Sequence, residues 1–384
     1  MAVQLRRSHR DLSWDASTEA PRQYYTFAHP PCELVLDSGQ KLGPITVAYE
    51  TYGQLNAAGD NAILIAHALT GDSHVASHAP GEREGWWEPL VGTGRAFDTS
   101  RYFVVCSNVL GGCQGTTGPS SPDPKTGRPW GMRFPVITIR DMVRVQRHLL
   151  DYLGVRRLAA VAGGSMGGLQ VLEWAVTYPE LVEKALVFAA PGRISPQAIA
   201  YNEVMRQAIM LDPAWQGGDY QPGQGPARGL AVARMLGMIT YQSCESMNRK
   251  FGRAFRGRIP TDYFSFQGQF EVESYLHYQG QKLVRRFDAN SYLYLTRAMD
   301  LFDLGLGRGG YEEALKHIQA RTLVVGISSD ILYPAALERE LVEDLRRVGV
   351  EAEYVELQSP FGHDAFLIEF EQVGAIISDF LWKG

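Results

Sequence analysis

The chain has 384 residues, of which 45% are apolar and 21% are charged. This length and composition suffice to bury one large core or two modest ones, which excludes a disordered chain and a small disulfide-stapled scaffold. Lys and Arg number 37 against 42 Asp and Glu, giving a formal charge of −5. Because the overall charge gives no footprint for nucleic acid or an anionic membrane, we expect neither as a partner.

The sequence contains no motif typical of membrane targeting or of zinc binding. The N-terminal residues MAVQLRRSHRDLSWDAS lack the apolar stretch of a signal peptide, and no run approaches the roughly 18 apolar residues of a membrane helix. A cytoplasmic protein is therefore expected. The chain has no C-x-x-C pair and no H-E-x-x-H pattern, which argues against zinc. We expect free thiols at Cys32, Cys106, Cys113 and Cys244.

Short apolar runs rich in Val, Ile and Ala alternate with helix-periodic segments along the chain. This alternation predicts an α/β fold, in which a mostly parallel sheet is covered by helices on both faces. The first two strands are expected to form an antiparallel lead-in, since turn residues lie between them. In chain order, the predicted strands are 32–36, 45–51, 62–66, 102–106, 158–162, 185–189, 322–326 and 352–357.

Three helices are predicted from their caps and periodicity. Thr138 and Asp141 have the spacing of a capping box ahead of an amphipathic run that ends near Gly154. A second helix is entered through Pro334. Residues 365–381 are expected to form the terminal helix.

The strand rhythm breaks between about residues 191 and 319, where long helical and polar stretches intervene. We interpret this part as a helical lid inserted into a core made of residues 1–190 and 320–384. Its GGDYQPGQGPARG tract predicts a mobile loop. The GLGRGG run at 305–310 satisfies G-x-G-x-x-G, but no predicted strand precedes it, so dinucleotide binding is not expected there.

A G-x-S-x-G motif carries the strongest chemical signal in the chain. It places Ser165 between the predicted strand LAAVA and the helical run LQVLEWAVTY. The pattern alone is weak, but a strand before it and a helix after it are typical of a nucleophile elbow. In that elbow a strained, sharp turn lifts the hydroxyl clear of the sheet. We therefore expect Ser165 to act as a nucleophile.

A serine nucleophile needs a base and a third group that orients the base. In the chain order typical of this elbow, the acid follows the serine and the histidine comes last. Asp330 and His363 follow the last two predicted strands, so both are expected at the same sheet edge as Ser165. We predict Asp330 as the acid and His363 as the base, with Asp303 as the weaker alternative for the acid.

Acyl transfer also needs two backbone N–H groups that stabilise the negative oxygen of the transition state. One is expected from Met166, directly after the nucleophile. The other is expected from the loop HALTG, which follows the predicted strand 62–66, with Leu69 as the best candidate. The alternative is that HALTG is only a strand-ending turn.

Several longer segments carry a family resemblance. The family is that of the homoserine O-acyltransferases of methionine biosynthesis, and the chain is most similar to the homoserine O-acetyltransferases among them, over about residues 24–381. The segments are HALTGDSHVAS, YFVVCSNVLGGCQGTTGPSSPDPKTGRPWG, FPVITIRDMVRVQ, AGGSMGGLQVLEWA and FGHDAFL. The resemblance implies an α/β-hydrolase fold with a helical lid, a homodimer formed through the lid helices, and no metal or redox cofactor.

The same resemblance implies a ping-pong reaction. Ser165 takes an acetyl group from acetyl-CoA, and the hydroxyl of L-homoserine then removes it, with His363 as base and acid in turn. It further implies that Arg234 binds the substrate carboxylate and Asp364 the substrate amine, a pairing that suits an amino acid. Succinyl-using relatives tend to place an arginine two residues after the catalytic acid. Here that residue is Leu332, which favours acetyl, because an unpaired carboxylate is costly to bury.

Several alternatives stay open. The chain resembles O-succinyltransferases as well, and L-serine, one methylene shorter, is discriminated by only about 1–3 kcal/mol. The same triad acts as an esterase or thioesterase when water reaches the acyl-enzyme. A non-catalytic binding or scaffold protein is a further alternative, although all three triad candidates are retained. Lys125 and Arg128 are expected to be solvated loop charges.

Overall fold

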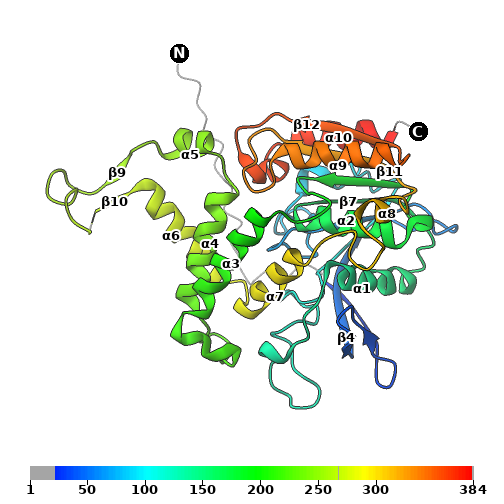
Figure 1. Cartoon of the computed structure of the whole chain (residues 1–384), viewed down its shortest axis with the longest axis horizontal. Coiled ribbons are helices and arrows are strands. Elements are labelled where there is room, and N and C mark those ends of the chain that lie inside the picture. Colours follow the sequence, from blue (N-terminus) through cyan, green and yellow to red (C-terminus); the bar gives the residue numbers. More distant parts are fainter. Residues whose placement is uncertain (1–21, 267, 383–384) are drawn as a thin grey trace.

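The computed structural model describes residues 22–266 and 268–382. Its centre is an eight-stranded sheet with the order β1-β4-β6-β5-β7-β8-β11-β12 (Figure 1). β4 is antiparallel to both of its neighbours, and every pair from β6 to β12 is parallel. The strands are β1 (Gln23–Phe27), β4 (Ile45–Tyr52), β5 (Ala62–Ala66), β6 (Phe103–Ser107), β7 (Leu158–Gly164), β8 (Lys184–Phe188), β11 (Arg321–Ile327) and β12 (Ala352–Leu357). The predicted α/β class is confirmed.

The sheet separates two apolar cores, because successive side chains of a strand point to opposite faces. In β5, Ala62 and Leu64 belong to one core, and Ile63 and Ile65 to the other. Covered on both faces, such strands appear in the sequence as continuous apolar runs. The first core includes side chains of α1 (Ile139–Tyr152), α2 (Met166–Thr177) and α9 (Ala335–Arg347), besides helices between β8 and β11, and the second core receives α10 (Phe370–Trp382).

The predicted antiparallel lead-in was wrong. Residues 34–35 (β2, Leu34–Val35) pair with β3 (Lys41–Leu42) in a separate two-stranded sheet. The antiparallel partner of β4 is instead β1, which the sequence analysis missed. β1 is the edge strand and most of its side chains are exposed or half-buried, so it lacks the apolar run that marks the inner strands. The other predicted strands are found within about two residues of their expected bounds.

The capping box of α1 is confirmed. The Thr138 hydroxyl accepts from the Asp141 N–H at 3.1 Å, and the Asp141 carboxylate accepts from the Thr138 N–H at 3.1 Å. Pro334 directly precedes α9, as predicted. The terminal helix was predicted to begin too early: Gly362–Leu367 is a 3₁₀ helix, Ile368 leaves the helical region (φ −127°, ψ −45°), and α10 begins only at Phe370.

Most helices of the chain between β8 and β11 lie to one side of the sheet, whereas α8 (Tyr311–Leu315) lies against α9 (Figure 1). α4 packs on α3 and α6, and a small hairpin, β9 (Phe255–Arg256) and β10 (Gln269–Phe270), extends farthest from the sheet. All of these helices fall inside the predicted lid, whose boundaries stay a prediction. They are α3 (Pro196–Met210), α4 (Ala227–Thr240), α5 (Cys244–Phe251), α6 (Glu271–Val284), α7 (Ala289–Asp300) and α8 (Tyr311–Leu315).

Residues 305–310 form turns that lead into α8, and no strand of the described chain runs into them. Over residues 22–266 and 268–382, none of the helices combines the length and apolar character needed to cross a bilayer.

Candidate active site

Ser165 occupies a strained turn between β7 and α2. Its backbone has φ 56° and ψ −125°, a combination that residues other than glycine rarely adopt. Such a conformation costs about 1–3 kcal/mol and persists only where the surroundings impose it. Here the Ser165 N–H donates to the Phe188 carbonyl of β8 at 2.9 Å, which ties the turn to the neighbouring strand.

The glycines of the motif allow this close packing. A Cβ atom on Gly167 would lie 2.1 Å from the Ala66 carbonyl oxygen, and one on Gly163 would lie 2.7 Å from the same oxygen. Neither position has room for a side chain, since real contacts of a Cβ atom are almost never closer than 3 Å. The G-x-S-x-G pattern is therefore required by the packing of α2 on β5 as well as by the turn.

Asp330 and His363 form a buried acid–base pair. Nδ1 of His363 lies 2.6 Å from Oδ2 of Asp330. A carboxylate only accepts, so Nδ1 carries the proton and Nε2 is left as the basic nitrogen. Nε2 has no hydrogen-bond partner among the described residues. Burial lowers the pKa of His363, but the Asp330 carboxylate and its hydrogen bond outweigh burial and raise that pKa above its ordinary value.

Five of the seven predicted site residues line one cavity of about 340 Å³, and Asp330 and Met166 do not. Its lining includes the predicted nucleophile and base together with three other candidates: Ser165, His363, Leu69, Arg234 and Asp364. The side chain of Met166 is buried in the core, so only its backbone N–H is relevant to an oxyanion. As the first residue of α2, Met166 has an N–H group that the helix itself cannot satisfy.

The weaker acid candidate lies elsewhere. Asp303 is exposed, does not line the cavity, and accepts from the Gly305 N–H at 2.8 Å as a turn residue. Leu332 does line the cavity. Lys125 and Arg128 are exposed loop residues, as expected.

Arg234 and Asp364 place opposite charges on the cavity wall. Arg234, on α4, has its guanidinium carbon 5.7 Å from the ring centroid of Tyr241. The Asp364 N–H donates to the Tyr241 carbonyl at 3.1 Å, which fixes the residue after His363. Burial raises the pKa of Asp364 above its ordinary value, although Arg234 and His363 both oppose that rise. A cation and an acid on one wall suit a zwitterionic ligand.

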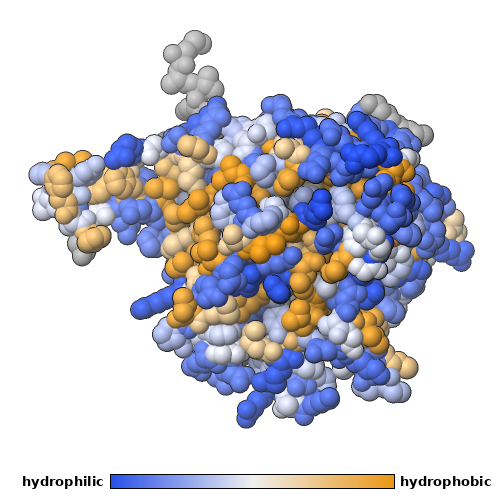
Figure 2. Space-filling view, viewed as in Figure 1, coloured by the Kyte–Doolittle hydropathy of each residue, from blue (hydrophilic) through white to orange (hydrophobic). Residues whose placement is uncertain are grey.

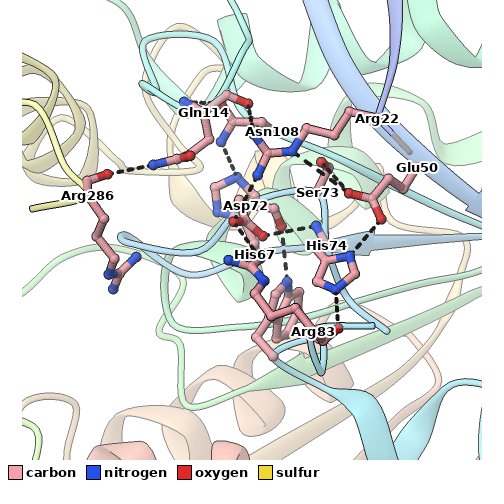
Figure 3. Close-up of polar contacts among 12 residues, drawn as sticks. Arg22, Glu50, His67, Asp72, Ser73, His74, Arg83, Asn108, Gln114 and Arg286 are labelled. Carbon is pink, nitrogen blue, oxygen red and sulfur yellow. Dashed lines mark hydrogen bonds and ion pairs between the residues drawn. The ribbon is translucent and has the colours of Figure 1, made fainter. Parts of the chain in front are cut away.

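The loop that carries Leu69 continues into a charged cluster that the sequence analysis missed (Figure 3). Asp72 forms ion pairs with Arg22 at 3.3 Å and with Arg83 at 3.2 Å. Glu50, fully buried on β4, accepts from His74 Nδ1 at 2.9 Å. Nε2 of His74 faces the Arg83 carbonyl at 2.7 Å, so both ring nitrogens face acceptors and the ring is an imidazolium.

The pKa values agree with this protonation state. Burial lowers the pKa of His74, but its hydrogen bonds to Glu50 and to the Arg83 carbonyl, together with the negative charge of Glu50, outweigh burial and raise that pKa above its ordinary value. The HALTGDSH segment carried the only sequence signal for the cluster, since its Asp and His residues are dense. Their partners Arg22 and Glu50 lie far away along the chain, and the pattern did not indicate them.

Two further polar residues of the cavity, Tyr241 and Arg286, were also missed. Arg286 follows another arginine in a helical stretch and carries no motif of its own. Metal binding has no counterpart in the described part of the chain, where no three His, Cys, Asp or Glu side chains gather as ligands. All four cysteines are free thiols.

Comparison with known proteins gives one consistent set of similarities. Residues 61–370 match the α/β hydrolase fold family. Over 362 residues the chain is 60% identical to a homoserine O-acetyltransferase of Symbiobacterium thermophilum, with 94% of each chain covered. The crystal structure of a homoserine O-acetyltransferase from Bacillus anthracis superposes with a TM-score of 0.88 at 30% identity, covering 94% of this chain and 97% of that one.

A structure named for a different activity is similarly close. The crystal structure of esterase E22 superposes with a TM-score of 0.86 at 30% identity, covering 94% of this chain and 99% of that one. Overall shape therefore does not separate acyl transfer from ester hydrolysis, and the residues of the cavity have to do so.

Proposed function

Because the chain belongs to the homoserine O-acetyltransferases, a family of acyltransferases with the α/β-hydrolase fold, we propose that it transfers an acetyl group from acetyl-CoA to L-homoserine. The products are O-acetyl-L-homoserine and CoA, in a step of methionine biosynthesis. One observation carries the proposal. The nucleophile and base candidates, Ser165 and His363, line the same cavity as the two charged groups suited to an amino acid, Arg234 and Asp364.

The first half-reaction acetylates the serine. Nε2 of His363 takes the proton of the Ser165 hydroxyl while Oγ attacks the thioester carbonyl. The oxygen that becomes negative is stabilised by the N–H groups of Leu69 and Met166. When the tetrahedral intermediate collapses, the C–S bond breaks and His363 returns the proton to the departing thiolate. Asp330 holds the imidazole in the required tautomer and stabilises its charged form.

The second half-reaction uses the same groups in reverse order. His363 takes the proton of the homoserine hydroxyl, whose oxygen attacks the acetyl-serine carbonyl. The bond between the acetyl carbon and Ser165 Oγ breaks, and His363 returns the proton to Oγ. Water is the competitor of homoserine in this step, since either nucleophile resolves the intermediate.

The cavity wall supports an amino acid as the acceptor. The Arg234 guanidinium pairs with the substrate carboxylate, and Asp364 accepts from the substrate ammonium. An arriving ammonium favours the ionised form of Asp364, opposing the burial that raises the pKa of this residue. Leu332 on the same wall supports acetyl over succinyl, because it offers nothing to pair with a distal carboxylate.

The main alternative is hydrolysis, which the similarity to esterase E22 favours. The two functions are separated by supplying acetyl-CoA with and without L-homoserine and measuring release of the CoA thiol. We expect fast release only when homoserine is present. Equal rates without it would identify a thioesterase. L-Serine and succinyl-CoA, each in competition with the proposed substrate, test the acceptor and the acyl group.

The assembly and location remain proposals as well. We propose a homodimer formed through the helical segment 191–319, in a cytoplasmic protein that needs no metal or redox cofactor. The arm between β9 and β10 supports association, because apolar side chains gather on it (Figure 2), with Phe264 at 85% exposure and Ile259 at 71%. Light scattering of the purified chain should give the mass of two copies. A monomer would contradict the dimer and leave the chemistry unaffected.

A further inference from the structure

Arg286 joins the helical segment to the loop that carries Leu69. It lies two residues beyond the end of α6 and lines the cavity. Its Nη1 atom donates to the Thr70 carbonyl at 2.7 Å, and its Nη2 atom lies 3.4 Å from the Thr70 hydroxyl oxygen. Within the described chain, both side-chain hydrogen bonds of Arg286 thus end on Thr70, the residue directly after the proposed oxyanion donor.

The other end of the same loop is fixed by His67. The Val109 N–H donates to Nε2 of His67 at 3.1 Å, so this nitrogen is the acceptor and Nδ1 carries the proton. Nδ1 in turn donates to the Ala68 carbonyl at 2.7 Å. Burial lowers the pKa of His67, in agreement with a neutral ring. Leu69 is therefore flanked on both sides by residues whose positions are fixed by hydrogen bonds.

The two anchors are connected through the segment that follows β6 (Figure 3). Nδ2 of Asn108 lies 3.2 Å from Nε2 of His67. Oδ1 of Asn108 accepts from the Gln114 N–H at 3.2 Å. The Gln114 side chain donates to the Arg286 carbonyl at 2.6 Å. A circuit of hydrogen bonds thus runs from His67 through Asn108, Gln114 and Arg286 to the loop again at Thr70.

We infer that Arg286 is a positioning residue for the oxyanion hole, which holds the Leu69 N–H in the direction that a tetrahedral acetyl oxygen requires. This inference rests on the acyl-serine mechanism proposed above. An oxyanion hole works because its donors are fixed before the charge develops, and losing one donor lowers kcat by about 10²- to 10³-fold. Through Arg286, the donor also depends on the helical segment being seated on the core.

A direct contact between Arg286 and the substrate carboxylate is the competing explanation, since the residue lines the cavity. The two roles differ in what they affect. Positioning of Leu69 affects the acetylation of Ser165 by every acyl donor, in the absence of any amino acid. A substrate contact affects the KM for homoserine and leaves the acetylation of Ser165 unchanged.

The test measures acetylation of Ser165 by p-nitrophenyl acetate, without CoA or homoserine, and the KM for homoserine in the full reaction. The variants are Arg286→Ala and Arg286→Lys, which keeps a charge but loses the fork. The matched control is Arg285→Ala, an exposed neighbour. Thermal unfolding checks that each variant is folded. If Arg286→Ala does not fold, Arg286→Lys still tests the inference.

We expect Arg286→Ala to slow acetylation by about 10²-fold or more, with Arg286→Lys intermediate and Arg285→Ala unchanged. Millimolar guanidinium chloride should restore part of the acetylation rate of Arg286→Ala and should not change the acetylation rates of the other variants. Unchanged acetylation with a raised KM for homoserine would overturn the inference and assign Arg286 to the substrate. If the proposed transferase function is wrong, thiol release from acetyl-CoA will not depend on homoserine. That outcome is distinct from the result of the acetylation assay, which can still be interpreted.

Discussion

Nδ1 of His363 lies 2.6 Å from Oδ2 of Asp330, while Oδ1 of Asp330 accepts from the N–H groups of Leu332 at 2.8 Å and Tyr333 at 3.0 Å. The carboxylate is therefore held by its own loop, independently of the imidazole. Its position fixes the tautomer of His363 and leaves Nε2 as the basic nitrogen, which receives the serine proton in the proposed mechanism.

Replacing this carboxylate by an amide should remove most of the activity. In Asp330→Asn the side-chain amide can donate to Nδ1, which favours the wrong tautomer, and we expect kcat to fall by about 10⁴-fold. Homoserine-dependent thiol release from acetyl-CoA measures the effect. The control is Asp303→Asn, since Asp303 lies in an exposed turn outside the cavity and should retain full activity. An equal loss in the two variants would contradict the assignment of the acid.

The pH dependence of kcat/KM should report His363. The imidazole accepts a proton only when neutral, so activity rises with pH, with a midpoint above the ordinary value of 6.5 because Asp330 raises the pKa of His363. The residual activity of Asp330→Asn should have its midpoint at a lower pH, since burial, which lowers the pKa of His363, is then opposed only by the charge of Asp364. Identical midpoints in both proteins would show that another group controls the profile.

Gly167, the last glycine of the G-x-S-x-G motif, should be irreplaceable. In Gly167→Ala the new methyl would lie 2.1 Å from the Ala66 carbonyl, so α2 must move from β5. We expect a loss of about 1–3 kcal/mol of stability in urea unfolding and little acetylation of Ser165. Gly374→Ala in α10 is the matched control, since its nearest contact is a Leu90 side-chain carbon at 3.3 Å. It should be neutral within about 1 kcal/mol.

A buried carboxyl near the site should make stability depend on pH. Glu338 on α9 is fully buried, and neither side-chain oxygen has a hydrogen-bond partner among the described residues. Burial, reinforced by Asp330, raises the pKa of Glu338 well above its ordinary value of 4.5. The folded state therefore binds a proton that the unfolded state has released above that value, so the contribution of Glu338 to stability falls as pH rises.

Glu338→Gln removes this titration while keeping the shape of the neutral acid. The thermal midpoint of the variant, taken relative to that of the unmodified chain, should rise as the pH is raised above 4.5, because only the unmodified chain then loses the contribution of the Glu338 proton. A difference in midpoint that stays constant across this range would mean that Glu338 is ionised in the folded protein.

The Glu50 cluster should be the most sensitive charged group outside the triad. Glu50→Gln leaves the His74 imidazolium without its carboxylate, and removing one partner of a buried pair costs about 3–5 kcal/mol. The exposed pair of Glu245 and Arg249 gives the control, since Glu245→Gln should change stability by about 0.5 kcal/mol or less. Because folding raises the pKa of His74, its contribution to the free energy of unfolding is complete below the ordinary pKa of 6.5. That contribution is lost as the pH rises through the pKa of His74 in the folded state. A loss of similar size in both variants would contradict the buried pair.

The sequence allowed much of the sheet and the gathering of Ser165, Asp330 and His363 to be predicted, and the reason is physical. Each of these residues lies in the segment that follows an apolar run, and parallel strands end at one sheet edge. β1 was not predicted because an edge strand buries few side chains and therefore has no continuous apolar run. The start of the terminal helix was misplaced because the backbone break at Ile368 has no signature in residue type.

Arg286 could not be predicted for a different reason. Its partner is the backbone carbonyl of Thr70, 216 residues away, and every residue has a carbonyl. The ion pairs of Asp72 and Glu50 could not be predicted for the same reason. Arg22 and His74 meet these partners only when folding brings segments together that are distant in the sequence. Sequence patterns indicate where strands end, whereas the contacts that fix a loop depend on the completed fold.

The origin of the cavity wall has an evolutionary consequence. Ser165, Asp330 and His363 come from loops beside the strands β7, β11 and β12, while Arg234 comes from α4 in the helical segment between β8 and β11. Selection acting on α4 alters what the cavity accepts without moving the strands that hold the nucleophile. Descendants of one ancestral scaffold are thus free to exchange water for a hydroxy amino acid as the acceptor of the acyl group.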